Sequence, residues 1–396
     1  MLNLGLTRFL PAPLAEALNE LVGIVVEGRQ LIKLRPRQAR AYEGKSVAVV
    51  GFFSTRCGLQ RAAELMVLDL ARQGVRVVRC DVSSLLGLTR NLFPEGVVAP
   101  QDLAAAGVTD IFMHVPGHMA APFLNALGQR AYGSMNLFAY WHWETQKVPR
   151  SWYRAALLMD EIWTPTPFVR DAFAYSFPKL SERLRIVPNA IMADPFSVST
   201  PAERAAARTR LGLAPNVFVA GFTFSMSSCF ERKNPLAALE AFSLAFPAGT
   251  EPAAFLMRCH EANDYPDGRE TLRARAEVDP RIVLIDTPER DVAVRDFYAA
   301  IDTLVTLHRS EGYGLTIAEA TQSGARAIVT DWGLAPDLAS LSGVREVTSV
   351  LIPLRDPQRI YEPGPDTLWA DPDIVAAARI LAEDAAAFRA EVDARV

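Results

Sequence analysis

Cysteine is scarce in this chain of 396 residues, which contains only Cys57, Cys80, Cys229 and Cys259. No two of them form a Cys-x-x-Cys pair, so the sequence predicts neither a disulfide framework nor a cysteine-based zinc site. The five histidines form no His-Glu-x-x-His arrangement either. We therefore expect reduced thiols, a cytoplasmic protein and no metal held by protein ligands.

Long apolar runs and net charge are also lacking. No uninterrupted apolar segment reaches the roughly 18 residues of a membrane-spanning helix, and the N-terminus lacks the charged start and cleavage site of a signal peptide. The 41 basic and 45 acidic residues leave a net charge of −4, so no overall field favours nucleic acid as a partner. The length predicts two domains of roughly 200 residues each.

The first 45 residues have two possible interpretations. Apolar residues recur at helical spacing between positions 14 and 25, and a basic cluster follows between positions 33 and 40. A helix packed on the protein beside a solvated basic loop explains this pattern, and glutamates at 16, 20 and 27 favour it. The alternative is a peripheral contact with the inner face of a membrane.

From Ser46 onward, apolar runs alternate with helical stretches, which is typical of parallel α/β sheets. The strands expected in the first half are 47–53, 75–80, 110–115, 136–141, 161–164 and 185–187. After a linker at 195–201, the strands expected in the second half are 217–224, 253–259, 282–286, 301–307 and 325–330. The sequence thus predicts two Rossmann-like doubly wound domains facing across a cleft that holds the ligand. Their expected bounds are 1–195, with residues 1–45 as an extension, and 196–375, followed by a C-terminal helix at 376–396.

Residues 308–324, His-Arg-Ser-Glu-Gly-Tyr-Gly-Leu-Thr-Ile-Ala-Glu-Ala-Thr-Gln-Ser-Gly, predict a glycine turn followed by a helix. The unpaired backbone N–H groups at the start of a helix suit a phosphate or a sugar hydroxyl. Glu311 precedes these groups and Glu319 follows eight positions later, so the two carboxylates can reach different parts of one ligand. This arrangement fits a nucleotide sugar, although two solvated glutamates on a surface helix explain the spacing alone equally well.

A pair of cations follows another expected strand. Residues 225–235 read Ser-Met-Ser-Ser-Cys-Phe-Glu-Arg-Lys-Asn-Pro, and strand ends at this edge of a parallel sheet face the ligand crevice. Arg232 can bind a diphosphate as a bidentate fork, and Lys233 can bind it as a point charge. A solvated loop that caps the next helix, with Pro235 in its first turn, is the alternative.

Together, these two segments resemble the Glu-x7-Glu element and the Arg-Lys-Asn-Pro segment of retaining GT-B glycosyltransferases, in particular family 4. The resemblance implies transfer of a hexose of the mannose or glucose type from a nucleoside diphosphate to a glycan or lipid-linked saccharide, in polysaccharide biosynthesis and without an obligatory metal or other cofactor. It implies that Arg232 and Lys233 hold the donor phosphates, that Glu311 positions the hexose and that Glu319 binds the ribose. The further donor contacts it implies are Gly312, Tyr313, Gly314, Leu315 and Thr316. By analogy with that family, the C-terminal helix at 376–396 is expected to cross back to the first domain.

The first domain carries weaker signals. The turn at 52–59 lies where a dinucleotide-binding fold would have Gly-x-Gly-x-x-Gly, but only Gly58 and the preceding Gly51 are present, which disfavours an NAD-linked enzyme. The resemblance makes Gly58 a donor-binding candidate. It also implies a histidine near the sugar and the reacting hydroxyl, for which we favour His114, while His118 is expected at the acceptor. The ordinary alternative for either histidine is that neighbouring groups of the fold hydrogen-bond its ring and that it contacts no ligand.

The stretch Tyr-Trp-His-Trp-Glu-Thr at 140–145 is similar to one found in polysaccharide-assembly members of that family. An aromatic face beside a carboxylate suits a sugar, so Trp141 and Glu144 are expected to bind the acceptor. Buried tryptophans in a core strand are the alternative. Asp371-Pro-Asp373 matches the Asp-x-Asp pattern of metal-dependent glycosyltransferases, but helix capping explains it better.

Three further questions stay open. GDP-mannose is the first donor that the resemblance suggests, with UDP- and dTDP-sugars as alternatives. A GT-B nucleotide-sugar epimerase would share the architecture without needing an acceptor. A non-catalytic subunit that binds sugar nucleotides would use the same residues without turnover, although the presence of both cations and both glutamates disfavours it.

Overall fold

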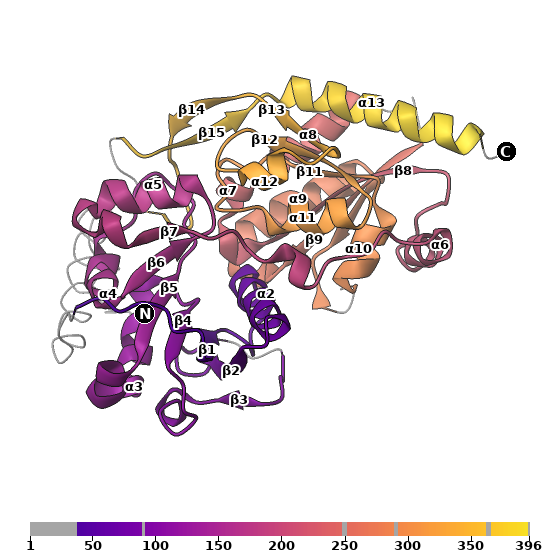
Figure 1. Cartoon of the computed structure of the whole chain (residues 1–396). Coiled ribbons are helices and arrows are strands. Elements are labelled where there is room, and N and C mark those ends of the chain that lie inside the picture. Colours follow the sequence, from indigo (N-terminus) through magenta and orange to yellow (C-terminus); the bar gives the residue numbers. More distant parts are fainter. Residues whose placement is uncertain (1–37, 89–91, 248–251, 289–291, 362–365, 395–396) are drawn as a thin grey trace. The chain divides into compact units, whose positions relative to one another are not determined.

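The computed structural model describes residues 38–88, 92–247, 252–288, 292–361 and 366–394. The helix and most of the basic cluster expected near the N-terminus lie outside these residues. The chain divides into two units: the first comprises the residues up to 143 together with 147–193, and the second comprises residues 144–146 together with 194–396 (Figure 1). Residues 144–146 therefore belong with the second unit, although their chain neighbours on both sides belong to the first.

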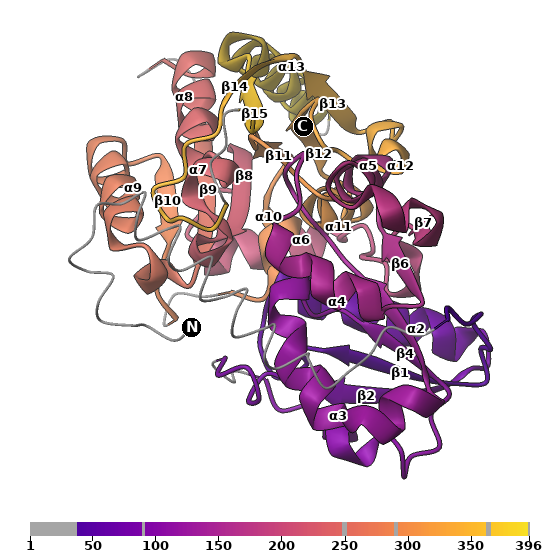
Figure 2. The same ribbon diagram turned by 90° about the vertical axis from the view of Figure 1, so that its left-hand side faces the viewer.

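The first unit is built on a parallel sheet of seven strands in the order β3-β2-β1-β4-β5-β6-β7 (Figure 1), of which Figure 2 labels β1, β2, β4, β6 and β7. The strands are β1 (Ser46–Gly51), β2 (Arg76–Asp81), β3 (Val97–Val98), β4 (Asp110–Met113), β5 (Asn136–Tyr140), β6 (Glu161–Thr164) and β7 (Leu184–Ile186). The α-helices are α2 (Gly58–Arg72), α3 (Ala120–Ser134), α4 (Tyr153–Leu158) and α5 (Pro167–Ser176). The strand order reverses between β1 and β4, which is where ligands bind in open sheets of this kind.

The second unit contains a parallel sheet of six strands in the order β10-β9-β8-β11-β12-β13 and an antiparallel pair, β14-β15. The strands are β8 (Phe218–Ser225), β9 (Ala253–His260), β10 (Ile282–Ile285), β11 (Thr303–Thr306), β12 (Arg326–Thr330), β13 (Val344–Val347), β14 (Ser349–Pro353) and β15 (Leu368–Pro372). The α-helices are α6 (Pro201–Arg210), α7 (Phe230–Lys233), α8 (Pro235–Ala245), α9 (Pro266–Val278), α10 (Val294–Ala300), α11 (Leu315–Gln322), α12 (Pro336–Ala339) and α13 (Ile374–Asp393). Here the order reverses between β8 and β11.

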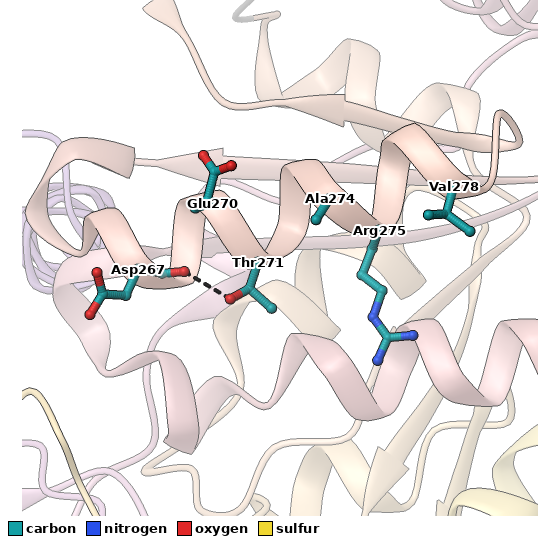
Figure 3. Close-up of a pocket in the computed structure, with 6 residues that line it drawn as sticks. All are labelled: Asp267, Glu270, Thr271, Ala274, Arg275 and Val278. Carbon is teal, nitrogen blue, oxygen red and sulfur yellow. Dashed lines mark hydrogen bonds between the residues drawn. The ribbon is translucent and has the colours of Figure 1, made fainter.

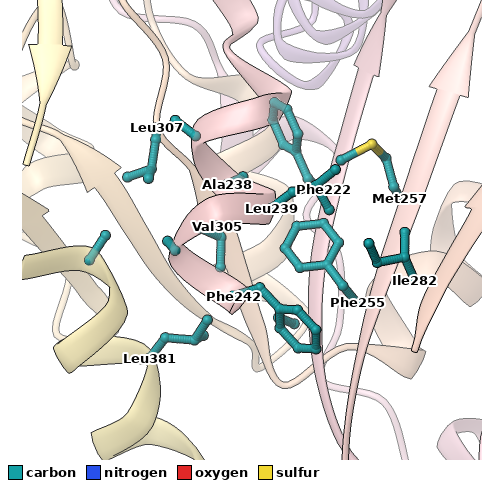
Figure 4. Close-up of a cluster of buried hydrophobic side chains, with 14 of the residues drawn as sticks. Phe222, Ala238, Leu239, Phe242, Phe255, Met257, Ile282, Val305, Leu307 and Leu381 are labelled. Atoms are coloured by element: carbon teal, nitrogen blue, oxygen red, sulfur yellow. The ribbon is translucent and has the colours of Figure 1, made fainter. Parts of the chain in front are cut away.

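The core of the second unit is aromatic and aliphatic (Figure 4). Phe222 and Phe255 come from adjacent strands and pack with Phe242 of α8. Leu381 of α13 joins the same cluster, so the C-terminal helix, which the sequence predicted as a separate segment, packs on α8 within the second unit. Burial of each large apolar side chain contributes roughly 1.5–3 kcal/mol, and this core fixes the edge of the sheet from which the candidate site projects.

The predicted fold class is confirmed in that both units are doubly wound α/β domains. The capping interpretation of the Asp-x-Asp sequence is also confirmed, because Asp373 Oδ1 accepts a hydrogen bond of 2.9 Å from the N–H of Ala376 at the start of α13. Asp371 instead pairs with Arg309, at 2.6 Å. None of the helices in the described parts of the chain is long and apolar enough to cross a bilayer.

Candidate functional site

The two predicted cations lie at the carboxyl end of β8, in the short helix α7. This helix is bounded by Cys229 and Asn234, which both have positive φ values, 70° and 54°. Left-handed backbone at residues other than glycine costs free energy and is found preferentially at functional sites. The Asn234 side chain donates to the carbonyl of Leu307, at 2.9 Å, and so holds the segment against the end of β11. β8 and β11 are the neighbouring strands at which the sheet order reverses.

Arg232 is fixed by several contacts and is only 3% exposed. Its Nε donates to the carbonyl of Ser228 at 3.2 Å, and one terminal nitrogen donates to the carbonyl of Ser310 at 3.0 Å. The same terminal nitrogen lies 3.6 Å from Glu311 Oε2. The guanidinium is therefore held in place before any ligand binds, and this lowers the entropic cost of binding.

Lys233 and Glu311 form a direct ion pair, with 2.6 Å between Nζ and Oε2. The other carboxylate oxygen of Glu311 accepts from the N–H of Gly312, at 3.1 Å. Burial acts to raise the pKa of Glu311, but the charges of Lys233, Arg232 and His308 outweigh it and hold this pKa well below its ordinary value. The carboxylate is thus ionised throughout the physiological pH range and accompanies two cations that are ready to meet an anion.

The glycine turn leads directly into α11. Gly314 precedes the helix with φ 107°, and none of the described side chains caps the first turn. Leu315 and Thr316, the first two helical residues, are partly exposed. The start of α11 can therefore offer backbone donors and a partial positive charge close to Glu311 in the sequence.

Two further contacts hold this turn. The phenol hydroxyl of Tyr313, a buried residue, donates to Asp337 Oδ2 at 2.8 Å. Gly333, after β12, has φ 76°, and a Cβ at this position would lie 2.4 Å from the carbonyl oxygen of Glu311. The backbone of the loop after β12 therefore packs directly on the backbone of Glu311, and only glycine leaves room for this contact.

Glu319 lies on α11 and is half-buried. Its Oε2 accepts from the hydroxyl of Tyr298 on α10, at 3.0 Å, so its carboxylate is oriented by a neighbouring helix. The structure thus joins Arg232, Lys233 and Glu311 by direct contact and places Glu319 on the helix that follows. The predicted ribose role of Glu319 stays a prediction.

Two of the residues predicted in the first unit flank its own reversal of strand order. Gly58 begins α2 after β1, and a side chain there would meet no atom within 4 Å. His114 follows β4, is 1% exposed, stacks on Tyr140 with 4.7 Å between ring centroids and approaches Met66 Sδ at 3.4 Å. Burial, aided by the charge of His142, holds the pKa of His114 well below its ordinary value, so this ring is neutral near pH 7.

The predicted acceptor residues have different surroundings. His118 is exposed and lies 5.6 Å from the ring centre of Trp152. Trp141 is 1% exposed, and its indole N–H donates to the carbonyl of Val115 at 2.7 Å, as expected for a buried tryptophan. Glu144 belongs to the second unit, where its carboxylate accepts from the hydroxyl of Tyr361 at 3.0 Å. The acceptor roles of these residues stay predictions.

Shallow grooves occur elsewhere on the second unit. One follows α9 and is lined by Asp267, Glu270, Thr271, Ala274, Arg275 and Val278 (Figure 3). It contains none of the predicted site residues, and its one internal hydrogen bond in Figure 3 runs from Thr271 to the carbonyl of Asp267 within the helix. A smaller one is lined by Glu231, Arg309, Ile352, Pro353, Arg355 and Trp369. In the described parts of the chain, no group of three or more His, Cys, Asp and Glu side chains is arranged to hold a metal ion.

His308 is expected to make the folded protein less stable at acid pH. The ring is fully buried, its Nε2 lies 3.2 Å from the carbonyl of Trp332, and burial lowers its pKa to about 4. Because the unfolded chain binds this proton near pH 6.5 and the folded chain does not, stability is full above pH 6.5 and falls as the pH drops towards 4. We expect His308 to contribute roughly 3 kcal/mol to this fall.

Urea unfolding of the wild type and of His308→Asn at pH 7.5 and pH 5 tests this expectation. The variant should lose less stability than the wild type between the two pH values. Equal losses would show that His308 is protonated in the folded protein as readily as in the unfolded chain.

Comparison with known proteins shows the fold. No protein-family model and no curated protein sequence matches the chain. Among solved structures, HepE of Anabaena in complex with UDP and glucose is similar at a TM-score of 0.57 and 15% identity, over 88% of this chain and 95% of that one. A glycosyltransferase from Rickettsia africae is similar at 0.56 and 14% identity, over 88% and 93%. WaaG, a glycosyltransferase involved in lipopolysaccharide biosynthesis, is similar at 0.55 and 14% identity, over 87% and 92%. The chain therefore has the GT-B fold, with two Rossmann-like α/β domains.

Proposed function

We propose that this protein is a retaining glycosyltransferase that moves a hexose from a nucleoside diphosphate to a saccharide acceptor, either a glycan or a lipid-linked sugar. The observation that carries the proposal is the cluster of Arg232, Lys233 and Glu311 at the carboxyl ends of β8 and β11. The uncapped start of α11 follows directly. A diphosphate requires cations and backbone donors, and a hexose requires a fixed acceptor of hydroxyl hydrogen bonds.

The donor is the part of the proposal with most support. HepE, which shares the fold, was crystallised with UDP-glucose as well as with UDP. The resemblance of the Arg-Lys-Asn-Pro and Glu-x7-Glu segments suggests GDP-mannose first. We therefore propose a hexose of the glucose or mannose type on UDP, GDP or dTDP.

In the proposed reaction, the bond between the sugar and the leaving phosphate breaks, and negative charge develops on the diphosphate. Arg232, Lys233 and the first N–H groups of α11 would stabilise that charge, while Glu311 orients the hexose. In a retaining front-face reaction the acceptor oxygen forms its bond to the anomeric carbon from the face that the phosphate leaves, and the leaving phosphate accepts the proton of the acceptor hydroxyl. We expect no obligatory metal, because the two cations can neutralise the diphosphate themselves. His114, which is neutral, could contact the sugar without adding a charge.

Acceptor binding through His118, Trp141 and Glu144 stays a proposal that the sequence resemblance supports. A nucleotide-sugar epimerase with this fold would act on the donor alone. Incubation with each nucleotide sugar, with and without a saccharide acceptor, separates the two activities. A transferase forms a new glycoside with the anomeric configuration of the donor, whereas an epimerase changes the sugar of the nucleotide when no acceptor is present.

Glu319→Gln tests the predicted ribose contact. Losing a charged hydrogen bond to a ribose hydroxyl should cost about 1.5 kcal/mol, so the Kd for the nucleoside diphosphate should rise about tenfold. Inorganic pyrophosphate has no ribose and serves as the control ligand, and its Kd should stay unchanged. Weakening of both ligands to the same extent in calorimetry would contradict a ribose role and indicate a general disturbance of α11.

A further inference from the structure

Glu144 is held inside the second unit by contacts at both its side chain and its backbone. Its carboxylate accepts from the Tyr361 hydroxyl at 3.0 Å, and its carbonyl accepts from the Ser310 hydroxyl. Two residues later, the side-chain oxygen of Gln146 accepts from the N–H of Leu368, at 3.2 Å. Glu144 is therefore fixed against the loop that carries Glu311, and Gln146 is fixed against the start of β15.

Tyr361 connects this carboxylate with the cations. It is 4% exposed, and the guanidinium carbon of Arg232 lies 5.8 Å from its ring centre. Burial raises the pKa of Tyr361 well above its ordinary value, so the phenol stays protonated and donates a hydrogen bond to Glu144. Ser310 connects Arg232 with the backbone of Glu144, because its carbonyl accepts from Arg232 while its hydroxyl donates to the backbone carbonyl of Glu144.

Two cations and two carboxylates of this region bear on the binding of an anion. Arg232 and Lys233 are positive, and Glu311 and Glu144 are negative. Burial alone would lower the pKa of Arg232, but the neighbouring Tyr361, Glu144 and Glu311 raise it. An isolated buried cation pair would be costly, and the carboxylates reduce that cost while no ligand is bound. A ligand anion must then compete with charges that are already present.

We propose that Glu144 is an internal counter-ion of Arg232, a positioning residue whose negative charge weakens the binding of anions at the Arg232 and Lys233 pair. This inference rests on the proposed phosphate-binding role of those two cations. It differs from the acceptor role predicted from the sequence, because it concerns the donor phosphates. Its function would be to keep the leaving nucleoside diphosphate from binding so tightly that product release becomes slow.

The test is Glu144→Gln, with inorganic pyrophosphate as the calorimetric probe. The glutamine keeps a side-chain oxygen for Tyr361 and the same backbone, but it removes the charge. The Kd for pyrophosphate should fall about tenfold at low ionic strength, as expected for the loss of one nearby unit charge, and the difference should shrink as salt is added. A lower Kd cannot come from a disrupted site, because disruption would weaken the binding of pyrophosphate.

Two variants serve as controls. Gln146→Met removes the hydrogen bond to Leu368 from the same segment without changing its charge, and its pyrophosphate Kd should not fall. Tyr361→Phe removes the phenol hydroxyl but leaves the carboxylate charged, so its Kd should stay within about threefold of the wild type. Tightening in either variant equal to that in Glu144→Gln would overturn the electrostatic account.

The remaining outcomes separate this inference from the proposed function. If the wild type binds pyrophosphate and Glu144→Gln binds it equally or more weakly, the counter-ion role is wrong while the phosphate site stands. If Glu144→Gln changes only the KM for the saccharide acceptor, the acceptor role is correct instead. If neither protein binds pyrophosphate, the phosphate site and the inference both fail.

Discussion

Lys233→Ala should lower kcat/KM for sugar transfer about a hundredfold. The substitution removes a cation that lies 2.6 Å from Glu311 and that we propose opposes the charge developing on the leaving diphosphate. A group of this kind typically supplies about 3 kcal/mol of transition-state stabilisation. The substitution also removes the nearer of the two cations beside the Glu311 carboxylate and leaves the guanidinium of Arg232, at 3.6 Å, so the hexose would be held less firmly.

Lys179→Ala is the matched control for this variant. Lys179 is exposed in the first unit and is not part of the predicted site, and its substitution removes the same positive charge. Steady-state assays of both variants should show wild-type activity for Lys179→Ala only. If Lys233→Ala turned over at the wild-type rate, the proposed role of Lys233 would be ruled out.

Gly333→Ala should destabilise the second unit by roughly 2–4 kcal/mol and abolish most of the activity. The new Cβ would lie 2.4 Å from the carbonyl oxygen of Glu311 and 3.1 Å from its backbone nitrogen, so the backbone must move. The positive φ at this position adds strain for any side chain. Because the displaced residue is Glu311 itself, the ion pair with Lys233 should be disturbed together with the fold.

Gly343→Ala provides the comparison, because its Cβ would come no closer than 3.7 Å to another backbone atom. It should change the free energy of unfolding by less than about 1 kcal/mol. Denaturant unfolding and transfer assays of the two variants would measure both effects. A Gly333→Ala protein as stable and active as Gly343→Ala would show that the loop after β12 does not hold Glu311 in place.

The sequence predicted the sheets well wherever strands are buried. Strand β6 has the predicted bounds, and β1, β8 and β9 differ from the prediction by no more than two residues at either end, because central parallel strands are continuous apolar runs. The β14 and β15 pair was missed. Val350 is 66% exposed and Leu351 42% exposed in β14, and a strand at a surface gives no such run. Helix α9 was missed for a similar reason, since six of its 13 residues are charged and only Gly268 and Leu272 are buried.

Part of the site could also be predicted. Arg232 and Glu311 are 79 positions apart, but each follows a parallel strand, and the carboxyl ends of such strands meet at one edge of the sheet. The involvement of Tyr361, Gly333 and His308 was not predicted. Tyr361 follows no predicted strand, and its contact with Glu144 joins residues 217 positions apart through a fold that local patterns do not specify. The positive φ of Gly333 likewise becomes meaningful only when the backbone of Glu311 lies against it.

A crystal structure of the full chain with a bound nucleoside diphosphate sugar would test the central proposal most directly. We expect the diphosphate within hydrogen-bonding distance of Arg232, Lys233 and the first N–H groups of α11, with the hexose beside Glu311. A nucleotide bound elsewhere, with the ion pair of Lys233 and Glu311 unchanged and no phosphate near it, would contradict the proposed donor site.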